Sequence, residues 1–331
     1  MEQSNTSNAR TRRFAAYAWC VTVLTLAVIL WGAYVRASGS GDGCGAHWPL
    51  CNGTVALPSA AETKTLVEFA HRATSGLDGL LVVVLVVWAF RLFPRKHAVR
   101  KSATLTAVFI VTESLIGAGL VLLRLVADNA SIARAFYLSI HLVNTFVLIA
   151  ALALTAWWAT DTGSAQPRLR EFARGRVGAA LACALALGVS GAVAALGATL
   201  FPESARAEVT TGDVSPQARL LFSLRQYKLH PLVALAVGAY VVYFAVASAK
   251  TVKGAWVRRW SWAVVVLYAA QVSVGLMNAA LAAPVWLQIV HLLFADLLWL
   301  ALVLLSSSSL ARRGVGAEEF ERADLSAAVE I

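Results

Sequence analysis

Eight long apolar runs, separated by polar or glycine-containing segments, dominate the sequence and most constrain its fold. They lie at residues 14–35, 68–90, 102–125, 136–159, 177–200, 228–248, 260–281 and 286–308. A helix needs about 20 mainly apolar residues to cross the hydrocarbon core of a bilayer. The mean hydropathy of +0.69 is too high for an ordinary soluble domain. The sequence therefore predicts an all-α integral membrane protein with eight transmembrane helices.

The distribution of basic residues predicts the orientation of these helices. Most of the 28 lysines and arginines fall in alternate segments. These segments are 1–13, 91–101, 160–176, 249–259 and 309–331. Basic residues in short loops favour the cytoplasmic side, so we expect both termini to be cytoplasmic. The net charge of +10 is thus explained by topology, and nucleic acid is not expected as a partner. The first run is longer than a signal-peptide core, which favours a retained helix.

The sequence GDGCGAHWPLCNG, residues 41–53, brings two cysteines into the first loop on the outer side. Disulfides form and persist outside the cytoplasm, so Cys44 and Cys51 can pair there. The alternative is a zinc site that also uses His47, although a structural zinc ion takes four ligands. The sequence favours the disulfide and leaves the zinc site as the minor alternative.

The chain repeats an order of landmarks, which predicts two similar four-helix bundles. Residues 111–121 resemble 268–278, and residues 140–153 resemble 290–303. Internal duplication is common in membrane folds and creates paired sites. The predicted halves are 14–159 and 177–308, joined by a cytoplasmic linker at 160–176. Cytoplasmic tails at 1–13 and 309–331 complete this organisation.

Four of the six histidines fall near the starts of the even-numbered runs: His71, His141, His230 and His291. Because every even helix runs inward, all four imidazoles are expected near the outer surface at similar depth. Any one of them could be a hydrogen-bonded packing residue. Two imidazoles on facing helices, however, can ligate one haem iron inside a four-helix bundle. Zinc or copper is less favoured, because no carboxylate or thiolate companions recur in both halves.

Several charged residues accompany the histidines. Glu68 precedes His71 by three residues and shares its helical face. It could act in chemistry, or it could be an interfacial carboxylate paired with Arg72 or Lys64. Glu113 and Asp296 lie deeper in their helices and could make polar contacts between helices.

Haem propionates seek basic groups near the outer surface, and four residues are candidates to bind them. These are Arg72, Arg219, Arg225 and Lys228. Ordinary solvation in a loop is the alternative for each one.

These features together resemble the haem A synthase family over roughly residues 14–308. The resemblance rests on the Gly-rich loop ending in Trp48-Pro49-Leu50-Cys51, on the EFAHR motif at 68–72, and on one histidine at the outer end of each even helix. Members of this family oxidise haem O to haem A for haem-copper terminal oxidases. The combination of features is more specific than any one motif.

The resemblance implies a role for individual residues. Glu68 and His71 match the family's essential acid and histidine, and His141 matches the histidine of the fourth helix, so these three would act at a haem O site. His230 and His291 match the pair that ligates a haem b cofactor. Cys44 and Cys51 match paired cysteines that many members carry as a disulfide.

The chain also departs from the family pattern. His71 is followed by Arg72, whereas His230 is followed by Pro231, so the second half lacks the His-Arg pair. His47 stands where many relatives have an acid just before Trp-Pro.

The implied reaction converts one porphyrin methyl group of haem O into a formyl group. Breaking a methyl C–H bond needs iron chemistry, which side chains cannot supply. The implied surroundings are a bacterial cell membrane, an electron donor that the sequence does not name, and a haem O synthase (protohaem farnesyltransferase) that could hand over haem O. The sequence also leaves homo-oligomerisation open.

A second function uses the same four histidines: a non-catalytic dihaem b-type electron carrier. Such a carrier has no need for Glu68 or for a cysteine loop in one half alone. A transporter would need broken helices with glycine or proline at midplane. The candidates are Gly117, Gly119, Gly188 and Gly191, but small-residue helix packing explains them equally, so a transporter is disfavoured.

Overall fold

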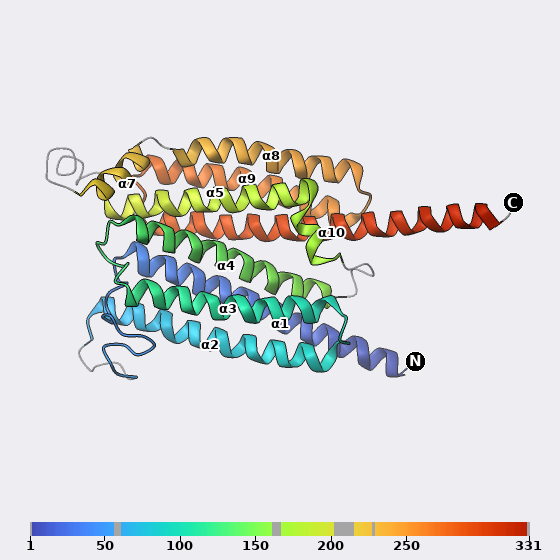
Figure 1. Ribbon diagram of the computed structural model, residues 1–331, viewed down its shortest axis with the longest axis horizontal. Coiled ribbons are helices and arrows are strands. Elements are labelled where there is room, and N and C mark those ends of the chain that lie inside the picture. The colour runs from blue at the N-terminus through green and yellow to red at the C-terminus, as the bar shows by residue number, and fades with distance from the viewer. Residues whose placement is uncertain (1, 56–60, 161–166, 202–214, 227–228, 330–331) are drawn as a thin grey trace.

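The computed structural model describes residues 2–55, 61–160, 167–201, 215–226 and 229–329. Over these residues the chain folds into helices joined by short loops, and Figure 1 shows the long helices lying side by side. Eight are long: α1 (Glu2–Ala37), α2 (Thr63–Leu92), α3 (Ala98–Leu122), α4 (Ile132–Trp158), α5 (Gly175–Leu200), α8 (Leu229–Thr251), α9 (Ala255–Ala280) and α10 (Val285–Val329). Two are short: η1 (Leu169–Ala173) and α7 (Pro216–Gln226).

The prediction of eight membrane-spanning helices is confirmed. Each of the eight long helices contains a stretch apolar and long enough to cross a bilayer. Helix α2 begins at Thr63 rather than at 68, and α4 begins at Ile132 rather than at 136. Apolar composition marks the thickness of the hydrocarbon core, whereas a helix can continue through polar turns beyond it. The protein is therefore a multi-pass membrane protein with helices longer than their apolar runs.

Three helical segments were not expected from the sequence. Helix α7 lies between α5 and α8. Helix η1 lies in the predicted linker, 160–176, and α10 continues to Val329 through the predicted C-terminal tail, 309–331. Helix α7 is stabilised by burial, because Ala218, Leu221 and Phe222 pack on one face against Leu196 and Phe201. These three residues follow the i, i+3, i+4 spacing of an amphipathic helix, which a search for long apolar runs does not detect.

The helix starts that carry the four histidines lie at one end of the bundle. Figure 1 shows both chain ends on the right and the starts of α2, α4, α8 and α10 on the left. The loop after α1 and the short helix α7 also lie on the left. The four helix starts thus share one end of the bundle, whichever way the bundle crosses the membrane, and the similar depth of the four imidazoles stays a prediction.

Two apolar cores run along the molecule and meet at α4 and α10. The first is built mainly from α1 to α4, and the second from α5, α8, α9 and α10. At the seam, the indole nitrogen of Trp299 donates to the carbonyl of Phe146 over 2.7 Å, and their rings stack with centroids 5.4 Å apart. A second bond joins Trp158 to the hydroxyl of Ser307 over 3.0 Å. Both indole donors are satisfied, as buried polar groups require.

Orientation in the membrane remains a prediction, and reporter fusions test it. Alkaline phosphatase fused after residue 60 or after Asn129 should be active, because that enzyme forms its disulfides only outside the cytoplasm. A fusion after Lys96, at the opposite end, should be inactive. Activity in the reverse pattern would place the histidine end in the cytoplasm.

Candidate functional site

Each of the four histidines packs against a glycine on another long helix. The pairs are Gly32 with His71, Gly117 with His141, Gly191 with His230, and Gly275 with His291. The glycines lie on α1, α3, α5 and α9, and each histidine lies on the long helix that follows. The same contact therefore occurs twice in each half of the chain.

Three of these contacts are tight enough to favour glycine. A Cβ atom at Gly32, Gly191 or Gly275 would lie 2.8, 3.1 or 2.9 Å from Cε1 of the facing imidazole. Such distances are closer than real Cβ atoms normally come to their neighbours. Glycine inside a helix costs about 0.5–1 kcal/mol relative to alanine, so close approach of the ring explains its presence. At Gly117 the corresponding distance is 3.9 Å, which is an ordinary contact.

His230 and His291 face each other across the second core. Their ring centroids lie 6.3 Å apart, and the ring planes are nearly perpendicular, at 89°. Nδ1 of His230 lies 2.9 Å from the hydroxyl of Ser190, which leaves Nε2 free. Nε2 of His291 lies 3.3 Å from the amide nitrogen of Gln271. These two imidazoles are close enough that they would hold one haem iron between them.

His71 and His141 form the corresponding pair in the first half. They come from α2 and α4 and lie within electrostatic range of one another. Nδ1 of His71 is buried and makes no hydrogen bond to any residue that the structure describes; the same holds for Nδ1 of His141 and of His291. Buried polar atoms normally have partners. These residues therefore also fit a bound group that approaches the imidazoles.

Glu113 adds an acid to the first pair. Its Oε1 atom lies 3.4 Å from Nδ1 of His141. The amide of Asn144 donates to Oε2 over 2.6 Å, and the hydroxyl of Thr145 donates to Oε1. The sequence indicated only that Glu113 makes polar contacts between helices. It does so, and the structure adds the contact with a histidine that the sequence analysis missed.

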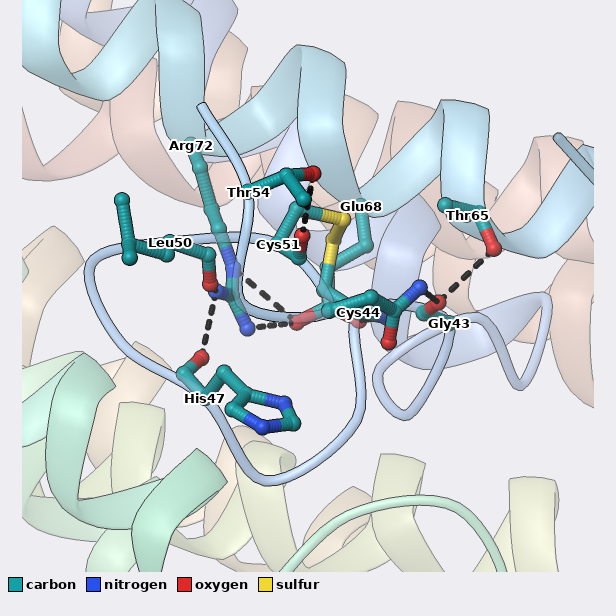
Figure 2. The surroundings of a disulfide bond; sticks show 10 residues. Gly43, Cys44, His47, Leu50, Cys51, Thr54, Thr65, Glu68 and Arg72 are labelled. Atoms are coloured by element: carbon teal, nitrogen blue, oxygen red, sulfur yellow. Dashed lines mark hydrogen bonds and ion pairs between the residues drawn. A yellow bond between two sulfur atoms is a disulfide. The ribbon is translucent and has the colours of Figure 1, made fainter. Parts of the chain in front are cut away.

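The loop after α1 folds back onto α2 around the disulfide between Cys44 and Cys51 (Figure 2). This confirms the predicted pairing, and it excludes the zinc alternative because the two sulfur atoms bond to each other. The backbone N–H of Cys44 donates to Oε2 of Glu68 over 2.8 Å. Cys44, Cys51 and Glu68 are all buried. The acid of the EFAHR motif is therefore in direct contact with the disulfide loop.

Arg72 connects the same carboxylate to the far side of the loop (Figure 2). Its Nη2 atom lies 2.5 Å from Oε1 of Glu68, and Nη1 donates to the carbonyls of His47 and Leu50 over 2.6 Å each. Glu68 is thus paired with Arg72, as one of the two alternatives expected. A haem propionate would compete with these loop carbonyls for the Arg72 guanidinium.

Gly43 allows the loop to lie directly on the first turn of α2. Its carbonyl accepts a bond of 2.7 Å from the hydroxyl of Thr65. A Cβ at Gly43 would lie 2.5 Å from the backbone carbonyl of Lys64, a contact that no side chain can make. The loop is consequently fixed to α2 by its backbone as well as by Glu68 and Arg72.

Among the described residues, no contact joins the other candidate propionate ligands to the histidines. The side chain of Arg225 and the whole of Lys228 lie outside the described residues, and Arg219 is exposed. Arg36, which sequence reasoning missed, joins the halves instead. Its guanidinium donates to Thr199 of α5 over 2.7 Å and to Gln288 of α10 over 3.2 Å. Gln288 precedes His291 by one helical turn.

The whole membrane region of the chain matches a known family. Residues 15–303 match the model of the COX15-CtaA family, described as cytochrome oxidase assembly protein. The chain belongs to this family. The family match extends from the first membrane helix into the last and so includes every residue of the site.

The individual relatives carry two different names. A protein named Protoheme IX farnesyltransferase from Thermus thermophilus is 49% identical over 304 residues, which cover 91% of this chain and 49% of that protein. A Heme A synthase from Symbiobacterium thermophilum is 39% identical over 134 residues, covering 40% of this chain and 42% of that protein. A Heme A synthase from Halalkalibacterium halodurans is 38% identical over 126 residues, covering 38% and 41%. The chain spans about half the length, or less, of these curated relatives.

The contacts of Arg72 predict how the loop responds to mutation. Arg72→Gln should speed reduction of the Cys44–Cys51 disulfide by dithiothreitol, because the loop loses charge-assisted bonds to Glu68 and to two carbonyls. Such bonds contribute about 1.5–3 kcal/mol, which corresponds to roughly 10- to 100-fold in the loop-opening equilibrium. Thiol alkylation followed by mass analysis measures the rate.

Arg100→Gln is the matched control, because Arg100 lies over the ring of Phe90 near the opposite end of α2. It should leave the reduction rate unchanged. Equal rates in the wild type and the Arg72 variant would mean that Arg72 does not hold the loop closed.

Proposed function

We propose that the protein is a haem A synthase, which oxidises one methyl group of haem O to a formyl group and so supplies haem A to haem-copper terminal oxidases. The observation that carries this proposal is a contrast between the halves. Both contain a histidine pair packed against glycines, but a disulfide loop bound to a buried acid accompanies only the first pair. The Heme A synthase names of two relatives support the same assignment.

In this proposal, His230 and His291 bind a haem b cofactor in the second half. The closeness of their rings supports this pairing, and Ser190 orients His230 through its contact with Nδ1. A haem held there would supply electron transfer. The role of this half is to move electrons rather than to bind the substrate.

His71 and His141 bind the substrate haem O in the first half. Haem iron supplies the oxidising power that no side chain has. The substrate carbon loses two hydrogens and gains one oxygen, which is a four-electron oxidation. An oxygen donor and an electron acceptor from outside the chain are therefore required, and protons must leave the site. Glu68, one helical turn from His71, is the proposed proton acceptor. The disulfide loop, bound to Glu68 and Arg72, limits the access of water from that end.

A dihaem b-type electron carrier is the second candidate function, and the geometry of His230 and His291 favours it equally. The two functions differ in what they require of the first half. An electron carrier gains nothing from a buried acid bound to a disulfide loop beside one histidine pair. This asymmetry is why we prefer the enzyme.

The proposal includes partners and a location. We place the protein in a bacterial cell membrane with cytoplasmic termini and the haem sites near the outer face. Haem O is the substrate, and a haem O synthase is its proposed source. The Thermus relative, which is named as a farnesyltransferase, aligns with this chain through only half of its own length, and this supports a link between the two activities.

Haem analysis tests the function directly. We expect co-expression with a haem O synthase, in a bacterium that lacks haem A, to yield haem A in extracts separated by chromatography and identified by mass. Finding only haem B and haem O, with folded and haem-loaded protein, would favour the electron carrier instead.

Glu68 has its own prediction. Glu68→Gln should lower conversion of haem O by about 100-fold or more, within the range of general acid–base contributions. Arg72→Gln separates the proton role from loop closure, because it opens the loop but keeps the acid. If both variants lose conversion equally, Glu68 acts only by holding the loop.

The glycine contacts predict a spectroscopic effect. Gly191→Ala or Gly275→Ala should displace the facing imidazole and weaken the low-spin absorption and paramagnetic resonance signals of the bound haem. Gly76→Ala is the control, because a Cβ there meets nothing within 4 Å. Unchanged low-spin signals in both test variants would rule out ligation that depends on these glycines.

A further inference from the structure

We infer that Glu113 is a positioning residue that orients His141 and holds its iron at a lower reduction potential than the iron of the second half, where Gln271 occupies the equivalent place. This inference rests on the proposed function to the extent that it takes haem to bind both histidine pairs. It adds a direction for electron flow between the two sites. That direction does not follow from the histidines alone.

The two residues occupy equivalent positions in the repeat. Glu113 precedes Gly117 by four residues on α3, and Gln271 precedes Gly275 by four residues on α9. Each glycine faces the histidine of the following helix. One helical turn from the glycine contact, therefore, each half presents one polar side chain to the same histidine. That side chain is an acid in the first half and an amide in the second.

Glu113 is fixed in place from α4. Asn144 donates to Oε2 of Glu113 over 2.6 Å and to the carbonyl of Phe109 over 2.8 Å, which ties the acid to the backbone of its own helix. Thr145 contacts the other oxygen and also the backbone carbonyl of His141. The carboxyl group thus lies 3.4 Å from Nδ1 of His141, an ion-pair contact in which Nδ1 makes no hydrogen bond to any described residue, and Nε2 remains for a metal.

Gln271 makes a different contact in the second half. Its amide nitrogen lies 3.3 Å from Nε2 of His291, and its Oε1 atom is buried without a hydrogen-bond partner among the described residues. The amide is neutral and does not approach Nδ1 of His291 in the way that Glu113 approaches Nδ1 of His141. The two irons would therefore have ligands of unequal electron-donating strength.

The group beside the ligating imidazole affects the reduction potential of the iron. A carboxylate beside the second ring nitrogen restrains the ring and, through its negative charge, makes the imidazole a stronger electron donor. Stronger donation stabilises oxidised iron and lowers its reduction potential. Electrons then run downhill from the site beside Glu113 to the site beside Gln271. This direction suits oxidation of a substrate in the first half.

Potentiometric titration of the full-length protein, purified and loaded with haem B, tests the inference. His141→Ala assigns the signal of the first site by removing it. Glu113→Gln gives that site the amide of the second half and should shift its midpoint potential upward. It should also lower the affinity for haem by roughly 10- to 100-fold, as is typical when a residue that supports a metal ligand is replaced. The potential of the other haem should stay constant.

Asp78→Asn is the matched control. Asp78 is a buried acid of α2 in the same half, and its carboxylate accepts a hydrogen bond from the hydroxyl of Thr25. The same change from acid to amide there should leave both potentials in place. Equal shifts in the two variants, or no shift with Glu113→Gln while haem is retained, would overturn the inference.

Glu113→Asp decides the case in which Glu113→Gln releases its haem. If the aspartate variant keeps its haem at a low potential, the negative charge of Glu113 is what lowers the potential. If the folded aspartate variant loses its haem, Glu113 acts by packing, and the inference is overturned. A failure of the proposed function can be distinguished from a failure of this inference. Protein that binds haem at both sites but forms no haem A would contradict the synthase and leave the potentials measurable.

Discussion

The contact between imidazole rings and helical glycines is the interaction on which the rest of the site depends. It lets α2, α4, α8 and α10 approach their neighbours closely enough for each ring to lie against a backbone. A methyl group at Gly32, Gly191 or Gly275 would push the ring into the space between the helices. Because the hydrocarbon region forces every span to remain helical, small residues are the available means of bringing a side chain this close.

The two halves share this contact but differ in what surrounds it. In the first half, Glu68 joins the disulfide loop to α2, and Glu113 stands beside His141. In the second half, Ser190 and Gln271 take the neighbouring positions, and both are neutral. The two halves thus carry similar histidine pairs, and the acids that contact the disulfide loop and His141 belong to the first half. The contact of Trp299 with Phe146 joins the two halves at their seam.

Much of the architecture could be predicted, because a membrane leaves few solutions. Eight apolar runs fixed the number of spans, and counting placed four histidines at one end. The helix ends were missed by several residues, since composition marks the hydrocarbon thickness and not the last hydrogen bond. Helix α7 was missed because its stability comes from Leu221 and Phe222 packing on Leu196 and Phe201, which are close only after folding.

The sequence by itself determined the membrane class, the number of spans, the disulfide pair and the four histidines, because apolar length and residue type carry that information locally. Only the tertiary structure decided which groups touch. It joined Glu68 to Cys44, Arg72 to two loop carbonyls, and Glu113 to His141. The reason is geometric: these contacts join separate helices or a loop and a helix, and their partners are set by side-chain direction and helix packing rather than by spacing along the chain.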